Sequence, residues 1–248
     1  MAERDVVFRV KRYRPQSGAK PAYQEYRFPY RHDMVVLDGL NYIKDHVDPS
    51  LTFRWSCRMG ICGSCGANVN GQPKLTCGTY IRDVHKARVT IDPLSNFPIL
   101  KDLVVDFDDF LNKLASVNPY IIREDWGDLT KEFTQYPEDV EAYRQQSLCI
   151  NCMLCYAACP VFGASPEFVG PAASALALRY IRDTRDEGAE TRLASLNTKK
   201  GIWECTFVGE CSVVCPKNVD PAAAIQTLKF LATTRHMRRL LMPKAVPR

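Results

Sequence analysis

Alternation of apolar and polar residues at the start of the chain predicts two β-strands. Residues 6–13 read VVFRVKRY, with Val, Phe and Val at every second position from residue 6. A second extended segment, residues 23–28, follows the turn-rich residues 15–21. Two such segments joined by a turn predict a β-hairpin.

The next apolar positions have a helical spacing. Val36, Leu40, Ile43 and Val47 lie three or four residues apart, as on one face of an α-helix, and Pro49 ends the pattern. Further on, the dipeptide NG at residues 70–71 predicts another hairpin turn.

The second half of the chain predicts mostly helices. Residues 96–117 change to a helical period, and we place the change of domain there. Residues 119–135 are polar and irregular, which predicts a connection over the surface, and Pro137 then stands at the first position of a helix. Residues 171–184 and 222–241 predict two more helices. The apolar stripe within 96–117 is formed by Leu103, Phe107, Phe110 and Leu114.

Length and composition narrow the class of protein. At 248 residues the chain is long enough for two modest domains, and a net charge of +5 says little about partners. No run approaches the roughly eighteen apolar residues of a membrane span, so a membrane role would need another chain. The first residues, MAERDVVFRV, resemble neither a signal peptide nor a transit peptide, which favours a prokaryotic cytosolic start. The eleven cysteines therefore indicate metal binding rather than disulfides.

Positive charge is concentrated at the end of the chain. From Lys229 onward there are six Lys or Arg and no Asp or Glu. These residues either form a solvated helix end, where cations interact favourably with the helix dipole, or contact anionic lipid headgroups. The six are Lys229, Arg235, Arg238, Arg239, Lys244 and Arg248.

Four cysteines in the sequence CINCMLCYAACP have the spacing of bacterial-type iron–sulfur proteins. Cys149, Cys152 and Cys155 are separated by two residues each, so that their thiolates turn toward one small body, and Cys159 precedes a proline. In two-cluster proteins of this type the cysteine before the proline binds the other cluster. The run therefore predicts a second run further along the chain.

The second run, CTFVGECSVVCP, lacks one cysteine. When the two Cys-Pro ends are aligned, its three cysteines match cysteines of the first run, and Val208 stands opposite Cys152. Cross-ligation gives one [4Fe-4S] cluster the ligands Cys149, Cys152, Cys155 and Cys215. The other site keeps Cys159, Cys205 and Cys211. Because valine offers iron no lone pair, we interpret this site as a [3Fe-4S] cluster, with a water-ligated fourth iron as the alternative.

A third group of cysteines precedes both runs. Cys57, Cys62 and Cys65 have the spacing C-x4-C-x2-C and Cys77 follows, as in plant-type [2Fe-2S] ferredoxins. Three glycines in this loop permit positive φ angles, which allow backbone amides to face a cluster. They lack the G-x-G core of a dinucleotide site. Zinc is the alternative for four thiolates, although structural zinc sites usually combine two paired knuckles.

Over nearly its full length the chain resembles the iron–sulfur subunits of succinate dehydrogenase and fumarate reductase. The resemblance is carried by RWSCRMGICGSCG at 54–66, NFPILKDLVVD at 96–106 and the two runs, the second extending through KNVDPAAAIQ to residue 226. It implies an α+β protein. An N-terminal β-grasp [2Fe-2S] ferredoxin domain would occupy 1–100, a connecting helix and linker 101–138, and an all-helical two-cluster ferredoxin domain 139–248.

The resemblance also implies a relay of single electrons. Family members pass electrons between the FAD of a flavoprotein subunit and a membrane quinone, and a membrane-anchor subunit holds the complex. We therefore interpret the chain as the iron–sulfur subunit of a respiratory succinate dehydrogenase of the tricarboxylic acid cycle. It would lie on the cytoplasmic side of a prokaryotic membrane, with no catalytic residue of its own and no nucleic-acid partner. The alternatives are a quinol:fumarate reductase or another quinone-linked dehydrogenase.

A quinone site beside the [3Fe-4S] cluster is a further implication of the resemblance. The matching positions are Pro160, Thr206, Phe207, Gln226 and Lys229. Lys229 either donates to a quinone oxygen or is an exposed helix lysine. Ubiquinone-using members carry a tryptophan shortly after the position of Cys159, where this chain reads PVFG, so menaquinone is favoured.

Two other classes of protein compete with this interpretation. The cluster spacings alone would permit a free-standing ferredoxin-like carrier, but the matching linker and the segment DPAAAIQ argue against it. A zinc-stabilised nucleic-acid-binding protein would use the basic end as a phosphate contact, but the spacing of the runs is wrong for zinc knuckles. His32, His46, His85 and His236 are scattered, which predicts surface or packing roles for them.

Overall fold

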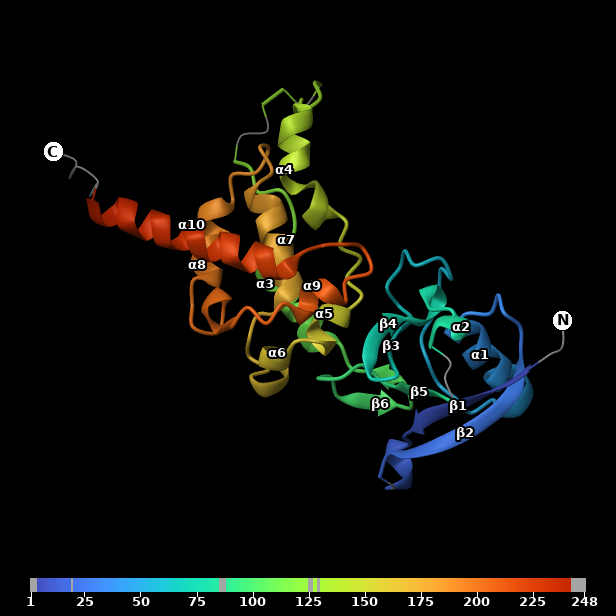
Figure 1. Cartoon of the computed structure of the whole chain (residues 1–248). Coiled ribbons are helices and arrows are strands. Elements are labelled where there is room, and N and C mark those ends of the chain that lie inside the picture. Colours follow the sequence, from blue (N-terminus) through green and yellow to red (C-terminus); the bar gives the residue numbers. More distant parts are fainter. Residues whose placement is uncertain (1–3, 19, 85–87, 125–126, 129, 242–248) are drawn as a thin grey trace.

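A computed structural model of the chain describes residues 4–18, 20–84, 88–124, 127–128 and 130–241. A β-sheet with short helices occupies the chain up to Asp92, a small hairpin follows, and from Asp108 onward the regular elements are helices. Figure 1 shows the sheet at one side of the molecule and the longer helices at the other. The predicted α+β fold class is therefore confirmed.

The N-terminal part is built on a five-stranded sheet with the order β2-β1-β5-β3-β4. β1 and β2 form the predicted hairpin, in which Phe8 lies opposite Tyr26, and β5 runs parallel to β1. The predicted turn at residues 70–71 joins β3 to β4. This mixed sheet is the expected β-grasp. The strands are β1 (Arg4–Arg12), β2 (Ala22–Tyr30), β3 (Gly66–Val69), β4 (Gln72–Leu75) and β5 (Val89–Asp92).

A helix packs on this sheet as the apolar spacing predicts. α1 (Val36–Tyr42) continues into the π-helical turn η2 (Ile43–Val47). Val36, Leu40 and Ile43 of the predicted stripe are buried, whereas Val47 is 49% exposed. A Cβ atom at Gly39 would lie 2.6 Å from the Phe8 ring, so the absent side chain lets the helix approach the sheet closely. The elements η1 (Pro15–Ser17), η3 (Thr76–Gly78) and α2 (Ile81–Val84) complete this part.

The prediction of a helix over residues 96–117 is wrong for the first half of that range. β6 (Ile99–Lys101) and β7 (Val104–Val105) form a small hairpin, and α3 spans only Asp108–Ser116. The hairpin turn contains the buried Asp102, with φ +48°. Its carboxylate accepts hydrogen bonds of 3.0 Å from Arg12 Nε and from the Thr52 backbone N–H. A buried ion pair with Arg12, at the end of β1, therefore fixes a turn that the local apolar spacing does not reveal.

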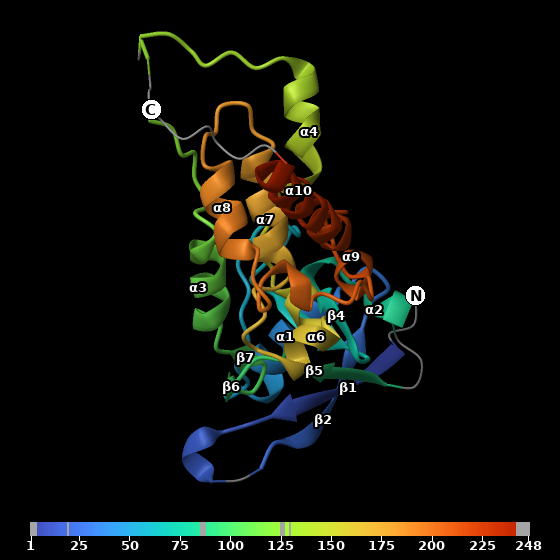
Figure 2. The ribbon, with the colours of Figure 1, turned by 90° about the vertical axis from the view of Figure 1, so that its left-hand side faces the viewer.

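The C-terminal part is a set of helices arranged around α7. α7 contacts α3, α4, α5, α8 and α10, and its alanines are buried, which lets these neighbours approach (Figure 2). The helix predicted at 171–184 ends at Ile181, and that predicted at 222–241 is α10. The helices are α4 (Pro137–Ser147), α5 (Leu154–Ala157), α6 (Pro160–Ala164), α7 (Pro171–Ile181), α8 (Ala189–Leu196), η4 (Ile202–Glu204), α9 (Glu210–Val213) and α10 (Pro221–Leu241). No helix in the described part of the chain is long and apolar enough to cross a membrane.

The connection between α3 and α4 is irregular, as predicted, but it is firmly held. Arg192 of α8 is fully buried and pairs with Asp186 at 2.6 Å. The same guanidinium donates to the backbone carbonyls of Val117, Asn118 and Tyr120. A buried cation with this many acceptors anchors the start of the connection to the helices.

Candidate metal centres

Four cysteines from both runs line one cavity in the helical part. Cys149, Cys152 and Cys155 come from the loop and first turn around α5, and Cys215 comes from the loop after α9. Asn151 and Met153 in this loop have positive φ angles of 52° and 66°, which curl the backbone around the cavity. Much of the remaining lining is apolar: Ile150, Met153, Leu154, Ala172, Ala175, Pro216, Val219 and Pro221. The four sulfurs therefore share a site of low dielectric.

The other three cysteines of the runs line a separate cavity. Cys159 lies at the start of α6, Cys205 follows η4 and Cys211 is in α9. Val208 lines the same cavity. Each run thus sends its last cysteine into the cavity of the other run.

The loop between Cys57 and Cys65 surrounds its first sulfur with backbone donors. Cys57 Sγ accepts from the N–H groups of Met59 (3.4 Å), Ile61 (3.3 Å) and Cys62 (3.3 Å). Cys65, just before β3, and Cys77, in η3, are buried at the base of the loop. N–H groups aimed at sulfur stabilise negative charge, as a thiolate and a sulfide require.

The ionisation of these thiols differs between the loop and the cavities. A hydrogen bond with the Ser64 hydroxyl lowers the pKa of the exposed Cys62 to about 6. Burial raises the pKa of Cys211 to about 11 and that of Cys152 to about 12, because apolar surroundings disfavour a thiolate. Positively charged iron would offset that cost by stabilising each thiolate directly. Thiolate donors, N–H groups and apolar walls together fit iron–sulfur clusters.

The geometry can be compared with that of a mononuclear metal site. Among the described residues, no three His, Cys, Asp or Glu side chains come together as ligands of a single ion. The thiolates that bind a cluster differ in this respect, because they are spread over several iron atoms.

The metal-free chain is expected to lose stability as the pH rises from about 9 toward 12. The folded state keeps a proton on Cys152 that the unfolded state releases near its ordinary pKa of 9.0, so the folded-state pKa of about 12 stabilises the fold below pH 9. The three-unit difference corresponds to about 4 kcal/mol, lost as the pH approaches 12. Urea unfolding of the metal-free chain at several pH values measures this loss. Cys152→Ser does not titrate in this range, so an equally steep loss in that variant would contradict the explanation.

The loop between Cys57 and Cys65, called the [2Fe-2S] loop below, directly touches the loop that carries Cys149, Cys152 and Cys155, called the four-cysteine loop below. A Cβ atom at Gly63 would lie 2.8 Å from the carbonyl oxygen of Ile150 and 2.9 Å from Cys152 Cα. At Gly66 it would lie 3.2 Å from the Cys152 carbonyl oxygen. Both glycines therefore serve the packing of one loop on the other. Gly63 also has the predicted positive φ angle (+74°), whereas Gly66 does not, so the prediction is wrong for Gly66.

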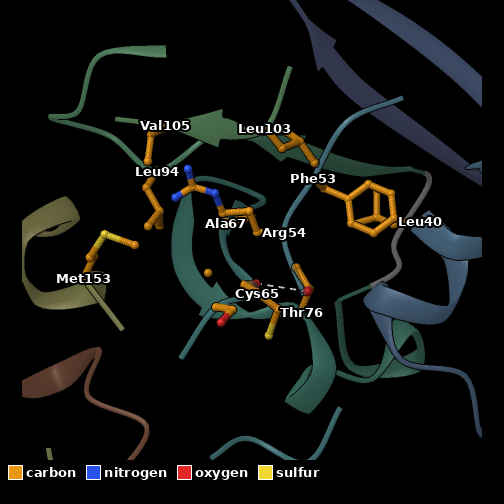
Figure 3. A pocket seen from close by; sticks show the side chains of 12 residues that line it. Leu40, Phe53, Arg54, Cys65, Ala67, Thr76, Leu94, Leu103, Val105 and Met153 are labelled. Carbon is orange, nitrogen blue, oxygen red and sulfur yellow. Dashed lines mark hydrogen bonds between the residues drawn. The ribbon is translucent and has the colours of Figure 1, made fainter. Parts of the chain in front are cut away.

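A small cavity lies behind this contact (Figure 3). Its lining includes Cys65 from the first loop and Met153 from the four-cysteine loop, so the two candidate sites share a wall. The Cys65 carbonyl accepts a hydrogen bond from the Thr76 hydroxyl (3.0 Å), drawn as the dashed line in Figure 3. The Arg54 guanidinium also lines the cavity and lies 4.2 Å from the centre of the Phe107 ring.

Asn96 supports the three-cysteine site from the preceding part of the chain. Its Nδ2 lies within hydrogen-bonding distance of three carbonyl oxygens near the end of α5, those of Tyr156 (3.0 Å), Ala157 (3.2 Å) and Cys159 (3.1 Å). A Cβ atom at Gly163 would lie 2.6 Å from Asn96 Oδ1, so this glycine makes room for the amide. The apolar period does not reveal this contact, although Asn96 begins the motif NFPILKDL.

The candidate quinone residues do not all meet at one place. Pro160, Thr206 and Phe207 line the three-cysteine cavity, whereas Gln226 and Lys229 do not. Lys229 Nζ donates to the Cys205 carbonyl at 2.8 Å. The Lys229 side chain therefore lies beside the three-cysteine cavity and holds the loop that carries Cys205.

Two of the scattered histidines have the predicted surface or packing roles. His46 packs on Tyr42, with ring centroids 4.7 Å apart, and His32 contacts Arg82. In the basic end of the chain, Arg235 pairs with Glu190 at 3.1 Å. The side chains of His85, His236, Arg238, Arg239, Lys244 and Arg248 lie outside the described residues.

Known proteins match both parts of the chain. Residues 7–112 match the family "2Fe-2S iron-sulfur cluster binding domain" and residues 145–219 match the "4Fe-4S dicluster domain". The fumarate reductase iron–sulfur subunit of Mycobacterium tuberculosis is 51% identical, over 96% of this chain and 97% of its own length. That of Escherichia coli O157:H7 is 48% identical, over 98% and 100%. The succinate dehydrogenase iron–sulfur subunit of Paracoccus denitrificans is 39% identical, over 92% and 88%.

A solved structure matches the whole fold as well. One chain of the Mycobacterium smegmatis Sdh1 complex in the apo form superposes with a TM-score of 0.83 at 26% identity, covering 95% of this chain and 98% of that chain. The chain therefore belongs to the family of iron–sulfur subunits of succinate dehydrogenase and fumarate reductase.

Proposed function

We propose that the chain relays electrons between the flavoprotein subunit and a membrane quinone in a succinate dehydrogenase complex. The observation that carries this proposal is the continuous order of the three candidate sites. The [2Fe-2S] loop touches the four-cysteine loop at Gly63. Cys155 lies in the four-cysteine cavity, and Cys211 of the three-cysteine cavity is close enough to contribute to raising its pKa. Three redox centres bound at these sites would lie in this order and would form a path for electrons through the protein.

Within this proposal, each group of cysteines that lies close together binds one cluster. Cys57, Cys62, Cys65 and Cys77 would hold a [2Fe-2S] cluster, the four-cysteine cavity a [4Fe-4S] cluster and the three-cysteine cavity a [3Fe-4S] cluster. When bound, such clusters supply one-electron oxidation and reduction. The chain itself supplies thiolates, N–H donors to sulfur, and apolar walls that exclude water, which together set the reduction potentials.

The partners in this proposal are a flavoprotein that carries FAD and a membrane anchor, which would hold the chain on the cytoplasmic side of a prokaryotic membrane. Exposed aromatic side chains support an anchor contact beside the three-cysteine cavity: Phe207 is 58% exposed and Phe230 of α10 is 67% exposed. Exposed apolar groups of this size are typical of a surface that another protein or a membrane covers. The quinone, favoured to be menaquinone, would bind there near Pro160, Thr206 and Phe207.

Fumarate reduction is the second candidate function. The identity is higher to fumarate reductase subunits, at 51% and 48%, than to the Paracoccus denitrificans succinate dehydrogenase subunit, at 39%. Membranes that contain the complex distinguish the two directions when succinate oxidation and quinol-dependent fumarate reduction are assayed side by side. A complex that reduces fumarate faster than it oxidises succinate would favour the second candidate.

Replacing Val208 with cysteine is expected to convert the three-iron cluster toward four irons and to lower its potential. Val208 lines the three-cysteine cavity, so a thiolate there would supply the missing ligand. EPR of the oxidised protein measures the loss of the three-iron signal. Val213→Cys is the control, because Val213 is 78% exposed and lies outside this cavity. An unchanged oxidised signal in Val208→Cys would contradict the alignment of the two runs.

A further inference from the structure

The Arg54 side chain lies in the small cavity that the two iron–sulfur loops share. The lining of this cavity includes Ser64 and Cys65 of the [2Fe-2S] loop and Met153 of the four-cysteine loop. Figure 3 shows the Arg54 side chain extending toward Leu94 and Met153. A positive charge is therefore held at the boundary between the two candidate sites.

No carboxylate among the described residues pairs directly with Arg54. No hydrogen bond or ion pair within that part of the chain reaches the guanidinium, which packs on the Phe107 ring, 4.2 Å from its centre. Asp106 and Asp108 attract it without forming an ion pair. Partial burial lowers the pKa of Arg54, because the charged form has lost part of its hydration. Negative charge bound beside such a cation stabilises it.

The proposed clusters would bring that negative charge. A [2Fe-2S] or [4Fe-4S] cluster with four thiolate ligands is negatively charged, and it gains one further negative charge when it is reduced. A nearby cation stabilises the more negative form and so raises the reduction potential. Because both loops line the cavity, one guanidinium can act on both clusters.

We propose that the Arg54 guanidinium raises the reduction potentials of both the [2Fe-2S] and the [4Fe-4S] cluster, and so stabilises an added electron where the two loops meet. The inference rests on the proposed function, which supplies the clusters. The lining of the three-cysteine cavity includes neither Arg54 nor any residue of the [2Fe-2S] loop. The potential of the three-iron cluster should therefore be affected least.

Substitutions of Arg54 separate its charge from its packing. Arg54→Gln removes the charge, whereas Arg54→Lys keeps the charge but loses the planar group that packs on Phe107. Arg54→Met also removes the charge and is used if the glutamine variant does not retain its clusters. The matched control is Arg9→Gln, because Arg9 is also partly buried and lies over an aromatic ring, that of Tyr23, at 3.8 Å. Arg9 lies on β1, which β5 separates from β3, and it lines none of the three cysteine cavities.

The test is a redox titration of the purified complex, followed by EPR. Arg54→Gln should lower the [2Fe-2S] and [4Fe-4S] potentials by an amount that corresponds to about a tenfold change in each reduction equilibrium, which is about 59 mV for one electron. Arg54→Lys and Arg9→Gln should keep both potentials close to those of the unmodified complex. The three-iron potential, measured in the same sample, reports any general disturbance of the fold.

The outcomes separate this proposal from the proposed function. Unchanged [2Fe-2S] and [4Fe-4S] potentials in Arg54→Gln, with all clusters present, would overturn the role of Arg54 and leave the electron relay standing. An equal shift in Arg54→Lys would show that packing on Phe107 matters rather than charge, and would overturn it as well. An equal shift of the three-iron potential would do the same. If the unmodified complex carried no such clusters, the proposed function would fall, and the role of Arg54 with it.

Discussion

Replacing Cys215 with alanine is expected to abolish the [4Fe-4S] cluster while the three-iron cluster remains. Cys215 belongs to the second run in sequence, but it lines the cavity of Cys149, Cys152 and Cys155. Removing it leaves a cubic cluster with one iron unsupported, next to thiols whose burial already disfavours the thiolate form. Iron content and EPR of the purified complex measure which cluster is lost.

Cys159→Ala provides the reciprocal experiment. Cys159 lies close in sequence to the first three cysteines but lines the cavity of Cys205 and Cys211. The variant should lose the three-iron signal and keep the [4Fe-4S] signal. Where an alanine variant does not accumulate, the corresponding serine variant keeps the volume of the side chain. If Cys159→Ala removed only the [4Fe-4S] signal, cross-ligation would be wrong.

Replacing Gly63 with alanine is expected to push the [2Fe-2S] loop away from the four-cysteine loop. The added Cβ atom would meet the Ile150 carbonyl oxygen at 2.8 Å, and the φ angle of +74° adds backbone strain. Together these effects should cost about 2–4 kcal/mol of stability and slow the reduction of the helical domain's clusters by succinate. Thermal unfolding and rapid-mixing reduction of the assembled complex measure the two effects.

Gly60→Ala separates strain from the clash between loops. Gly60 has a similar φ angle of +68°, but an added Cβ atom there meets nothing within 4 Å. It should therefore show the strain alone, with electron transfer between the domains unchanged. Equal effects of the two substitutions on the reduction rate would show that the contact at Gly63 does not hold the loops together.

The grouping of the cysteines in the two cavities could be predicted from sequence because its signal is local. Spacing within CINCMLCYAACP fixes which thiols turn inward, and the Cys-Pro end indicates which one points to the other cavity. The hairpin of β1 and β2 and the helix α1 could also be predicted, because each buries one face and so shows a clear period.

The remaining features depend on contacts between distant segments. Asp102 makes a turn because Arg12, from β1, is buried against it, so the helical period read through residues 96–117 was misleading there. Asn96 and Lys229 act through backbone carbonyls of other segments, and no pattern around either residue reports its acceptor. Gly63 likewise allows the two loops to pack closely because Ile150 of the other loop lies beside it, and no sequence pattern around Gly63 indicates that contact.

Low-temperature EPR of membranes enriched in the complex would show whether the clusters of this chain exchange electrons with succinate. The membranes are first oxidised with fumarate and then reduced with succinate, and the signals are followed against potential. An electron relay from the flavoprotein to the quinone predicts an oxidised three-iron signal that disappears with succinate while a reduced [2Fe-2S] signal appears. Clusters that are present but do not respond to succinate would contradict the claim that this chain serves a succinate-oxidising complex.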